Sequence, residues 1–270
     1  MRSPSNTRLI VFTACACLTA SLVYAQATEQ KPFEPTVGQA GKDVVWVPTP
    51  QALVNKMLDM AKVTPTDFLM DLGSGDGRTV ITAAKRGLKA MGIEYNPDMV
   101  ALSIKNAAAA GVSDKATFVK ADIFETDFSK ATVITLFLLP DLNLRLRPKI
   151  LEMAPGTRVV SNSFRMEAWE PDQTETVSED CVSWCTALLW IVPAKVEGTW
   201  HLAQGDLTLS QQFQMLTGTL GSTPISNARM RGNEISFTAG GAQYTGQVKG
   251  TTMQGTVKGG SGGSWTATKK

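Results

Sequence analysis

The segment "DLGSGDGR", residues 71–78, limits the possible folds of this chain more than any other. It follows the apolar run Phe68-Leu69-Met70 and carries glycine at positions 73, 75 and 77. Glycine has no Cβ, so the backbone of such a loop can pass close to a ligand. An apolar strand that ends in a glycine-rich loop is typical of nucleotide-binding α/β folds, in which the ligand lies at the carboxyl ends of the strands.

Apolar stretches alternate with segments of helical periodicity across residues 45–195. Strands are predicted near 67–71, 89–94, 116–121, 131–138, 156–162 and 183–192. Helices are predicted near 76–87, 97–110 and 143–154, and another from Pro50 onward, where apolar residues recur at helical spacing. Short apolar strands that alternate with helices indicate a mostly parallel sheet covered on both faces.

The composition changes near Lys195. More than half of the 23 glycines lie beyond it, among short runs of alternating polar and apolar residues. This pattern predicts an antiparallel β-sandwich or barrel over residues 196–270. The tract "GGSGGS", residues 259–264, is expected to be a long hairpin loop because Trp265 follows it and should pack inward. The chain is therefore expected to contain two domains, divided at about residue 195.

The N-terminus has the features of a signal peptide. Arg2 and Arg8 precede an apolar stretch from Leu9 to Val23, and Ala25 suits cleavage, which would remove residues 1–25. The stretch of about 15 residues is shorter than the roughly 20 that span a bilayer. We expect export to the periplasm or the medium, with an uncleaved anchor or a lipoprotein at Cys15 as alternatives. Residues 26–44 lack periodicity and are predicted to form an extended lead-in.

Cleavage would leave two cysteines, Cys181 and Cys185. Export permits a disulfide, but "CVSWCTALLWIV" is rich in residues that favour strands. Four positions along a strand separate two Cα atoms by roughly 13 Å, whereas a disulfide tolerates about 7 Å. The sequence therefore favours two packed thiols, and two cysteines are too few for a zinc site, so no metal is expected.

Two phosphate-binding motifs are excluded by residues at fixed positions. A P-loop carries Lys and Ser or Thr after its last glycine, whereas Arg78 and Thr79 follow Gly77 here. The dinucleotide fingerprint G-x-G-x-x-G, counted from Gly73, would need a third glycine at Arg78. Asp71 at the start of the loop would also repel a pyrophosphate. A ligand with a nucleoside part therefore remains as the candidate for this loop.

Three acidic residues end three successive predicted strands. Asp71 could pair with an ammonium group, and the carboxylate of Glu94 could accept both ribose hydroxyls. Asp122 could accept from an adenine amino group, with Ile123 against the ring. A lone Asp at a strand end is more often a helix cap, but three acids in strand order predict a ligand with ammonium, ribose and adenine. S-adenosylmethionine has all three.

These motifs resemble those of the class I (seven-stranded) S-adenosylmethionine-dependent methyltransferases. "DLGSGDGR", "GIEYN" and "ADIF" match that family's cofactor motifs in order and spacing, within about residues 45–193. The flanking stretches that begin "VPTPQALV" and "TLFLLPDLN" are similar to the mitochondrial lysine methyltransferases of the ATP synthase c subunit and the adenine nucleotide translocator. The resemblance implies a Rossmann-like α/β sheet of seven strands and S-adenosyl-L-methionine as cofactor. It assigns cofactor contacts to Pro48, Thr49, Asp71, Gly73, Ser74, Gly75, Gly77, Glu94, Tyr95, Asp122 and Ile123.

The turn "LLPDLN", residues 138–143, stands where base-modifying methyltransferases carry Asn/Asp-Pro-Pro-Tyr. Without that aromatic clamp a nucleic-acid base is a poor acceptor, whereas an apolar wall suits a lysine side chain. Lysine must lose its proton before it attacks, and desolvation favours the neutral amine. The candidate catalytic residues are Leu139, Pro140, Asp141 and Asn143, with Asn162 and Phe164 as weaker candidates. Helix capping after Pro140 explains Asp141 and Asn143 equally well.

The charge of the chain and its single histidine exclude further partners and catalytic residues. Arg2 and Arg8 account for the net charge of +2, so the remainder is neutral and a nucleic-acid partner is not expected. The only histidine, His201, lies in the predicted β-domain, which excludes a catalytic histidine in the methyltransferase domain. A protein-lysine methyltransferase is the favoured function. A small-molecule methyltransferase and a non-catalytic exported binding protein remain as alternatives.

Overall fold

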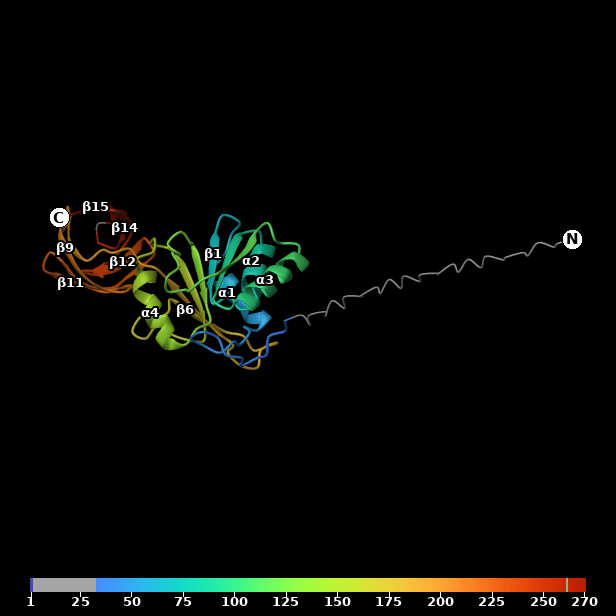
Figure 1. The fold of residues 1–270 in the computed structure, drawn as a ribbon. Helices are drawn as coiled ribbons and strands as arrows, with labels where there is room; N and C mark the ends of the chain where they lie inside the picture. Colours follow the sequence, from blue (N-terminus) through green and yellow to red (C-terminus); the bar gives the residue numbers. More distant parts are fainter. Residues whose placement is uncertain (2–32, 261) are drawn as a thin grey trace. The chain divides into compact units, whose positions relative to one another are not determined.

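The computed structural model describes residue 1, residues 33–260 and residues 262–270 (Figure 1). The predicted signal peptide and the start of the lead-in therefore lie outside the described residues. Residues 33–270 form one compact unit. No helix among the described residues is long and apolar enough to cross a membrane.

A seven-stranded sheet carries the predicted loop motifs. Its strands lie in the order β3-β2-β1-β4-β5-β7-β6. The first five of these strands pair in parallel, and β7 runs antiparallel to both β5 and β6. This confirms the Rossmann-like methyltransferase sheet. The strands are β1 (Phe68–Leu72), β2 (Lys89–Glu94), β3 (Ala116–Lys120), β4 (Val133–Leu136), β5 (Arg158–Asn162), β6 (Gln173–Thr176) and β7 (Thr186–Ile191).

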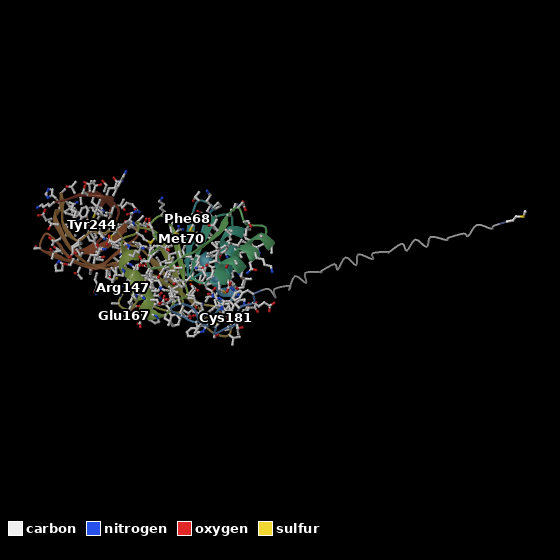
Figure 2. The ribbon with its side chains drawn as sticks, in the orientation of Figure 1. Phe68, Met70, Arg147, Glu167, Cys181 and Tyr244 are labelled. Carbon is white, nitrogen blue, oxygen red and sulfur yellow. A yellow bond between two sulfur atoms is a disulfide. The ribbon has the colours of Figure 1, made fainter. Side chains whose placement is uncertain are left out.

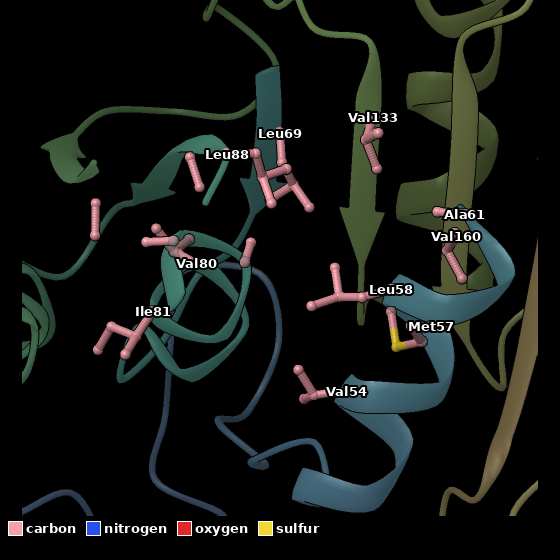
Figure 3. Close-up of a cluster of buried hydrophobic side chains, with 14 of the residues drawn as sticks. Val54, Met57, Leu58, Ala61, Leu69, Val80, Ile81, Leu88, Val133 and Val160 are labelled. Atoms are coloured by element: carbon pink, nitrogen blue, oxygen red, sulfur yellow. The ribbon is translucent and has the colours of Figure 1, made fainter. Parts of the chain in front are cut away.

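The helices of the described chain accompany this sheet: α1 (Gln51–Met60), α2 (Arg78–Lys85), α3 (Pro97–Ala109) and α4 (Pro140–Leu151). Side chains of α1 and α2 share one apolar cluster with Leu69, Val133 and Val160 of the sheet (Figure 3). The neighbouring strand residues Met70 and Ile134 belong instead to the cluster that contains α4. Successive strand residues point to opposite faces, so an uninterrupted apolar strand is what a sheet covered on both faces requires.

Most predicted elements are present with boundaries within two residues of the structure, and three differences are larger or of another kind. Helix α4 begins three residues earlier than predicted, because Pro140 occupies its first turn, where the missing N–H costs nothing. Strand β6 was not predicted, since it is a short polar strand at the edge of the sheet. Strand β7 begins at Thr186 rather than near 183.

The late start of β7 overturns the prediction of two unpaired thiols. Cys181 and Cys185 form a disulfide, with their Cα atoms 5.8 Å apart. Residues 182–184 form a bend rather than a strand, so the extended spacing assumed for the two cysteines does not apply. Cys181 is labelled in Figure 2.

The C-terminal segment forms a closed antiparallel barrel, drawn in orange to red in Figure 1. Strand β15 pairs with β8 and closes it, and closure of this kind removes the free sheet edges. Trp265 is 3% exposed and packs in the barrel core as predicted. The barrel strands are β8 (Gly198–Leu202), β9 (Gly205–Gln212), β10 (Met215–Leu220), β11 (Thr223–Arg231), β12 (Glu234–Ala239), β13 (Ala242–Lys249), β14 (Thr252–Lys258) and β15 (Gly263–Lys269).

Side chains of the barrel contact the segment that precedes β6. Arg229 donates a 2.6 Å hydrogen bond to Asp172, whose side chain is 1% exposed. The ring of Phe213 stacks on Trp169 with centroids 6.0 Å apart. Burial raises the pKa of Asp172, although Arg229 and the amide of Ile191 oppose this rise. Independent folding of residues 45–195 and 196–270 stays a prediction.

Candidate cofactor and acceptor site

One pocket collects most of the predicted cofactor residues. It lies at the carboxyl ends of β1, β2, β3 and β4 and includes residues 39–49 in its wall. The predicted residues that line it are Pro48, Thr49, Asp71, Gly73, Ser74, Gly75, Glu94, Tyr95, Asp122 and Ile123. The carboxyl ends of parallel strands meet at one edge of a sheet, so acids far apart in sequence converge there.

The glycine loop adopts conformations that other residues rarely reach. Gly73, Gly75 and Gly77 have φ values of 82°, 53° and 81°. A Cβ on Gly75 would lie 2.6 Å from Nε1 of Trp46. Gly77 does not line the pocket, and a Cβ there would lie 2.8 Å from the ring of Phe118. Its placement supports close packing of α2 on the sheet rather than the predicted cofactor contact.

Asp71 is a buried carboxylate at the end of β1. Its Oδ1 accepts a 2.6 Å hydrogen bond from the hydroxyl of Thr135. Burial raises the pKa of Asp71 to about 7; the bond from Thr135 opposes this rise, while Glu94 and Asp76 add to it. A buried carboxylate is stabilised by a cation, so this position fits the ammonium group of an amino acid.

Glu94 is held by two backbone amides. Its Oε2 accepts from the N–H of Gly75 and its Oε1 from that of Asn96, both at 2.9 Å. Each carboxylate oxygen accepts two hydrogen bonds, so both retain a lone pair for a ribose hydroxyl. The contact with Gly75 also fixes the glycine loop against the end of β2.

Asp122 accepts a 2.6 Å hydrogen bond from Lys42, a residue that sequence reasoning missed. This bond lowers the pKa of Asp122 and raises that of Lys42. The Lys42 ammonium also lies 5.2 Å from the ring centroid of Tyr95. No local pattern could reveal the pair, because 80 positions separate its members.

Residues 36–47 form a loop rather than the extended lead-in expected from their lack of periodicity. The N–H of Gly38 donates to the carbonyl of Trp46 at 2.8 Å, and the N–H of Trp46 donates to the carbonyl of Gln39 at 2.9 Å. Arg78 holds the next segment, because its Nη1 donates to the carbonyl of Thr49 at 2.9 Å. These contacts hold residues 39–49 in the wall of the pocket.

The part of the pocket beside the end of β4 is apolar, but the predicted catalytic residues do not line it. Phe137, Leu138 and Leu142 form its wall there. The candidates Leu139, Pro140 and Asp141 are exposed, and Asn143 is fully buried. These four candidates lie outside the pocket wall, so their catalytic role stays a prediction that this placement does not support.

Asn143 instead connects α4 to the segment after β5. Its Nδ2 donates to the carbonyl of Phe164 at 3.1 Å. The helix-capping explanation is wrong for Asp141 and Asn143, because α4 has no side-chain cap and begins after Leu139. Asn162, a weaker candidate, contacts Thr49 Oγ1 at 3.4 Å. Asn143 and Asn162 both join elements around the pocket.

Three aromatic rings meet beside this apolar part of the pocket. The centroid of Phe164 lies 6.0 Å from that of Phe137 and 5.1 Å from that of Trp184. Phe137 lines the pocket, and Trp184 is 44% exposed.

His201 lies on barrel strand β8, where it contacts Asp206. Among the described residues, no cluster of acidic, histidine or cysteine side chains suits a metal ion.

Comparisons with known proteins agree with this site. The family model for the ANTKMT methyltransferase domain matches residues 71–173. A protein-lysine N-methyltransferase of Saccharolobus islandicus is 45% identical over 139 residues, which cover 50% of this chain and 86% of that protein. A mouse lysine N-methyltransferase named for the ATP synthase c subunit is 39% identical over 115 residues, which cover 42% of this chain and 47% of that protein. The chain thus spans about half the length of this mouse relative.

A solved structure extends the agreement to the cofactor. The structure is that of an RNA methyltransferase from Salinibacter ruber in complex with S-adenosyl-L-homocysteine. It is 47% identical, with a TM-score of 0.52, and the match covers 56% of this chain and 96% of that one. The chain therefore belongs to the S-adenosylmethionine-dependent methyltransferases, in the family that includes the ANTKMT methyltransferase domain and related protein-lysine N-methyltransferases.

Proposed function

We infer that this protein methylates the side-chain amine of lysine in a protein. The observation that carries the inference is the apolar acceptor end formed by Phe137, Leu138 and Leu142. Its turn has the sequence "LLPDLN" in place of the Asn/Asp-Pro-Pro-Tyr motif of base-modifying enzymes. The names of the lysine-specific relatives support the same acceptor.

The residues of the chain suit the two requirements of this reaction, which are a bound cofactor and a neutral acceptor amine. S-adenosylmethionine supplies a methyl group on its sulfonium, and a neutral lysine amine that accepts it leaves S-adenosylhomocysteine and one proton. Asp71, Glu94 and Asp122 would hold the amino-acid, ribose and adenine parts of the cofactor. The apolar wall lowers the pKa of a lysine placed against it by desolvation. Orientation of the two reactants is then the main contribution of the protein.

We also propose that the protein acts outside the cytoplasm, in the periplasm or the medium. The N-terminal sequence has the charge and apolar pattern of a cleaved signal peptide. The disulfide between Cys181 and Cys185 supports this, because disulfides persist in oxidising compartments. A reporter fused after residue 45 would test it, and activity confined to the cytoplasm would contradict it.

Labelling of native acceptors tests the reaction. The protein is incubated with methyl-labelled S-adenosylmethionine and a cell-envelope extract from its own source, and label is located by mass spectrometry. We expect label on lysine side chains, and much less label with the Glu94→Ala variant at a limiting concentration of S-adenosylmethionine. Label only on RNA, on small molecules or on carboxylates would contradict lysine specificity and leave the methyltransferase assignment intact. Absence of S-adenosylhomocysteine would favour a non-catalytic binding protein.

A further inference from the structure

The disulfide between Cys181 and Cys185 has no part in the cofactor site. It closes a five-residue loop at the tip of the hairpin formed by β6 and β7. Trp184 lies inside this loop at a φ of 57°, a left-handed conformation that is unusual for a large side chain. The N–H of Val177 donates to the carbonyl of Cys185 at 2.9 Å, which fixes the loop to the edge strand. The position of Trp184 is therefore set by the crosslink and by the sheet.

The indole of Trp184 completes a continuous aromatic surface. Phe137 follows β4 and lines the cofactor pocket, and Phe164 follows β5 and stacks on it at an interplanar angle of 22°. Trp184 lies 6.1 Å from Phe137 and 5.1 Å from Phe164, measured between centroids. The rings thus lead from an exposed side chain to the wall of the pocket.

Contacts from two elements, α4 and β7, hold the backbone of the middle residue, Phe164, in place. Asn143 of α4 donates to the carbonyl of Phe164 at 3.1 Å. The N–H of Ser163, whose φ is 57°, donates to the carbonyl of Thr186 on β7 at 2.8 Å. Strained backbone that the surroundings hold fixed tends to occur at functional sites. Here two such positions occur at the same aromatic cluster, because Ser163 precedes Phe164 and Trp184 belongs to the cluster.

We propose that Phe137, Phe164 and Trp184 receive the acceptor lysine in its ammonium form, which loses its proton before it attacks the methyl group, and that the disulfide positions Trp184 within this site. This proposal rests on the lysine acceptor inferred above. The faces of aromatic rings attract ammonium groups within about 6 Å, and a methylated ammonium loses less hydration on binding than an unmodified one. The rings also cover the alkyl chain of lysine. Exposed Glu179 and Asp180 directly precede Cys181, so they add negative charge beside the loop that carries Trp184.

A binding measurement tests the site without turnover. The full mature chain with S-adenosylhomocysteine is titrated with Nα-acetyl-Nε-trimethyllysine methylamide or with uncharged Nα-acetyl-norleucine methylamide, and indole signals are followed by NMR. We expect the cationic probe to shift the Trp184 signal, which is identified by its loss in Trp184→Phe. Its affinity should exceed that of the neutral probe about five- to thirty-fold. Equal affinities would overturn the proposal.

Variants separate Trp184 and its crosslink from the rest of the loop. Trp184→Ala, chemical reduction, and Cys181→Ser combined with Cys185→Ser should each weaken the cationic probe about five-fold or more. Trp184→Phe should retain most of the affinity. Val182→Ala is the matched control, because Val182 is fully exposed in the same loop and lies outside the cluster. An unchanged affinity in Trp184→Ala would overturn the proposal.

Turnover distinguishes this proposal from the proposed function. At limiting extract, Trp184→Ala should lower the rate of lysine labelling about five-fold or more, and concentrated extract should reduce the deficit. The KM for S-adenosylmethionine should be unchanged. Lysine labelling that is equal in Trp184→Ala and the parent would overturn the aromatic site and leave the lysine acceptor standing. Probe binding without lysine labelling would support the aromatic binding site and contradict lysine as the methyl acceptor.

Discussion

The hydroxyl of Thr135 on β4 donates a 2.6 Å hydrogen bond to Oδ1 of Asp71, its register partner on β1. This bond opposes the rise in the pKa of Asp71 that burial causes. Because an ammonium group pairs with the ionised carboxylate, proton and cofactor compete for Asp71.

Cofactor binding should therefore weaken at low pH. The pKa of Asp71 is about 7, so the Kd for S-adenosylmethionine should rise about tenfold per pH unit below that value. Thr135→Val should raise the pKa and shift the onset to higher pH, and Asp71→Asn should give weak binding without this dependence. Calorimetric titration between pH 5.5 and 7.5 measures the effect. A flat Kd over that range would contradict the pairing of Asp71 with the cofactor.

The same protonation has the opposite consequence for stability. The folded-state pKa of Asp71 lies above its ordinary value of 3.8. The folded cofactor-free protein therefore binds the proton more tightly than the unfolded chain, and its free energy of unfolding should fall as the pH rises from about 4 to 7. In Asp71→Asn this contribution should vanish. Urea denaturation at several pH values would show it as a difference between the two proteins.

Glu94→Ala should weaken S-adenosylmethionine binding at least about tenfold, since loss of a charge-assisted contact costs roughly 1.5 to 3 kcal/mol. The glycine loop also loses an anchor, because the N–H of Gly75 donates to Glu94. Glu125→Ala removes an exposed carboxylate outside the pocket and should leave the affinity unchanged. Unaltered binding in a folded Glu94→Ala variant would refute the ribose assignment.

Gly75→Ala should impair cofactor binding by displacing Trp46. The new Cβ would lie 2.6 Å from Nε1 of that indole, and the φ of 53° adds strain. Gly111→Ala is matched for backbone strain, with a φ of 68°, but its Cβ would meet nothing within 4 Å. Backbone strain should cost both variants about 1 kcal/mol of stability, the contact with Trp46 should add to the loss in Gly75→Ala, and only Gly75→Ala should lose affinity. Equal affinities would show that Trp46 adjusts without cost.

Arg229→Met should destabilise the full chain by about 1 to 3 kcal/mol, because it removes a charged partner from the buried carboxylate of Asp172. The amide of Ile191 would remain as a donor to that carboxylate at 2.8 Å. Arg165→Met breaks an exposed ion pair with Glu170 and should cost less than about 1 kcal/mol. Urea unfolding of both variants compares them. Equal losses would mean that the contact between barrel and sheet contributes little.

A chain of residues 26–195 should stay folded and bind cofactor, because every residue of the pocket wall precedes residue 195. It should be less stable than the mature protein, since Trp169 loses its stack with Phe213. Circular dichroism and cofactor titration would check this. An insoluble product, from a protein that is otherwise well behaved, would show that barrel and sheet share one folding unit.

The sequence by itself determined the parallel part of the sheet and the acidic half of the site. Short apolar strands and glycine at 73 and 75 are local signals, and the parallel sheet they predict brings Asp71, Glu94 and Asp122 to one edge. The order of the strands was enough to predict that these three residues lie together, because the carboxyl ends of parallel strands converge.

Only the tertiary structure decided what surrounds those acids. Lys42 reaches Asp122 across 80 positions, and residues 36–47 are ordered by contacts rather than by periodicity. Cys181 and Cys185 pair because the hairpin turns before β7 begins, and that turn places Trp184 beside Phe164. Contacts of this kind depend on which loops the fold brings together. A local pattern of residue types therefore does not reveal these contacts.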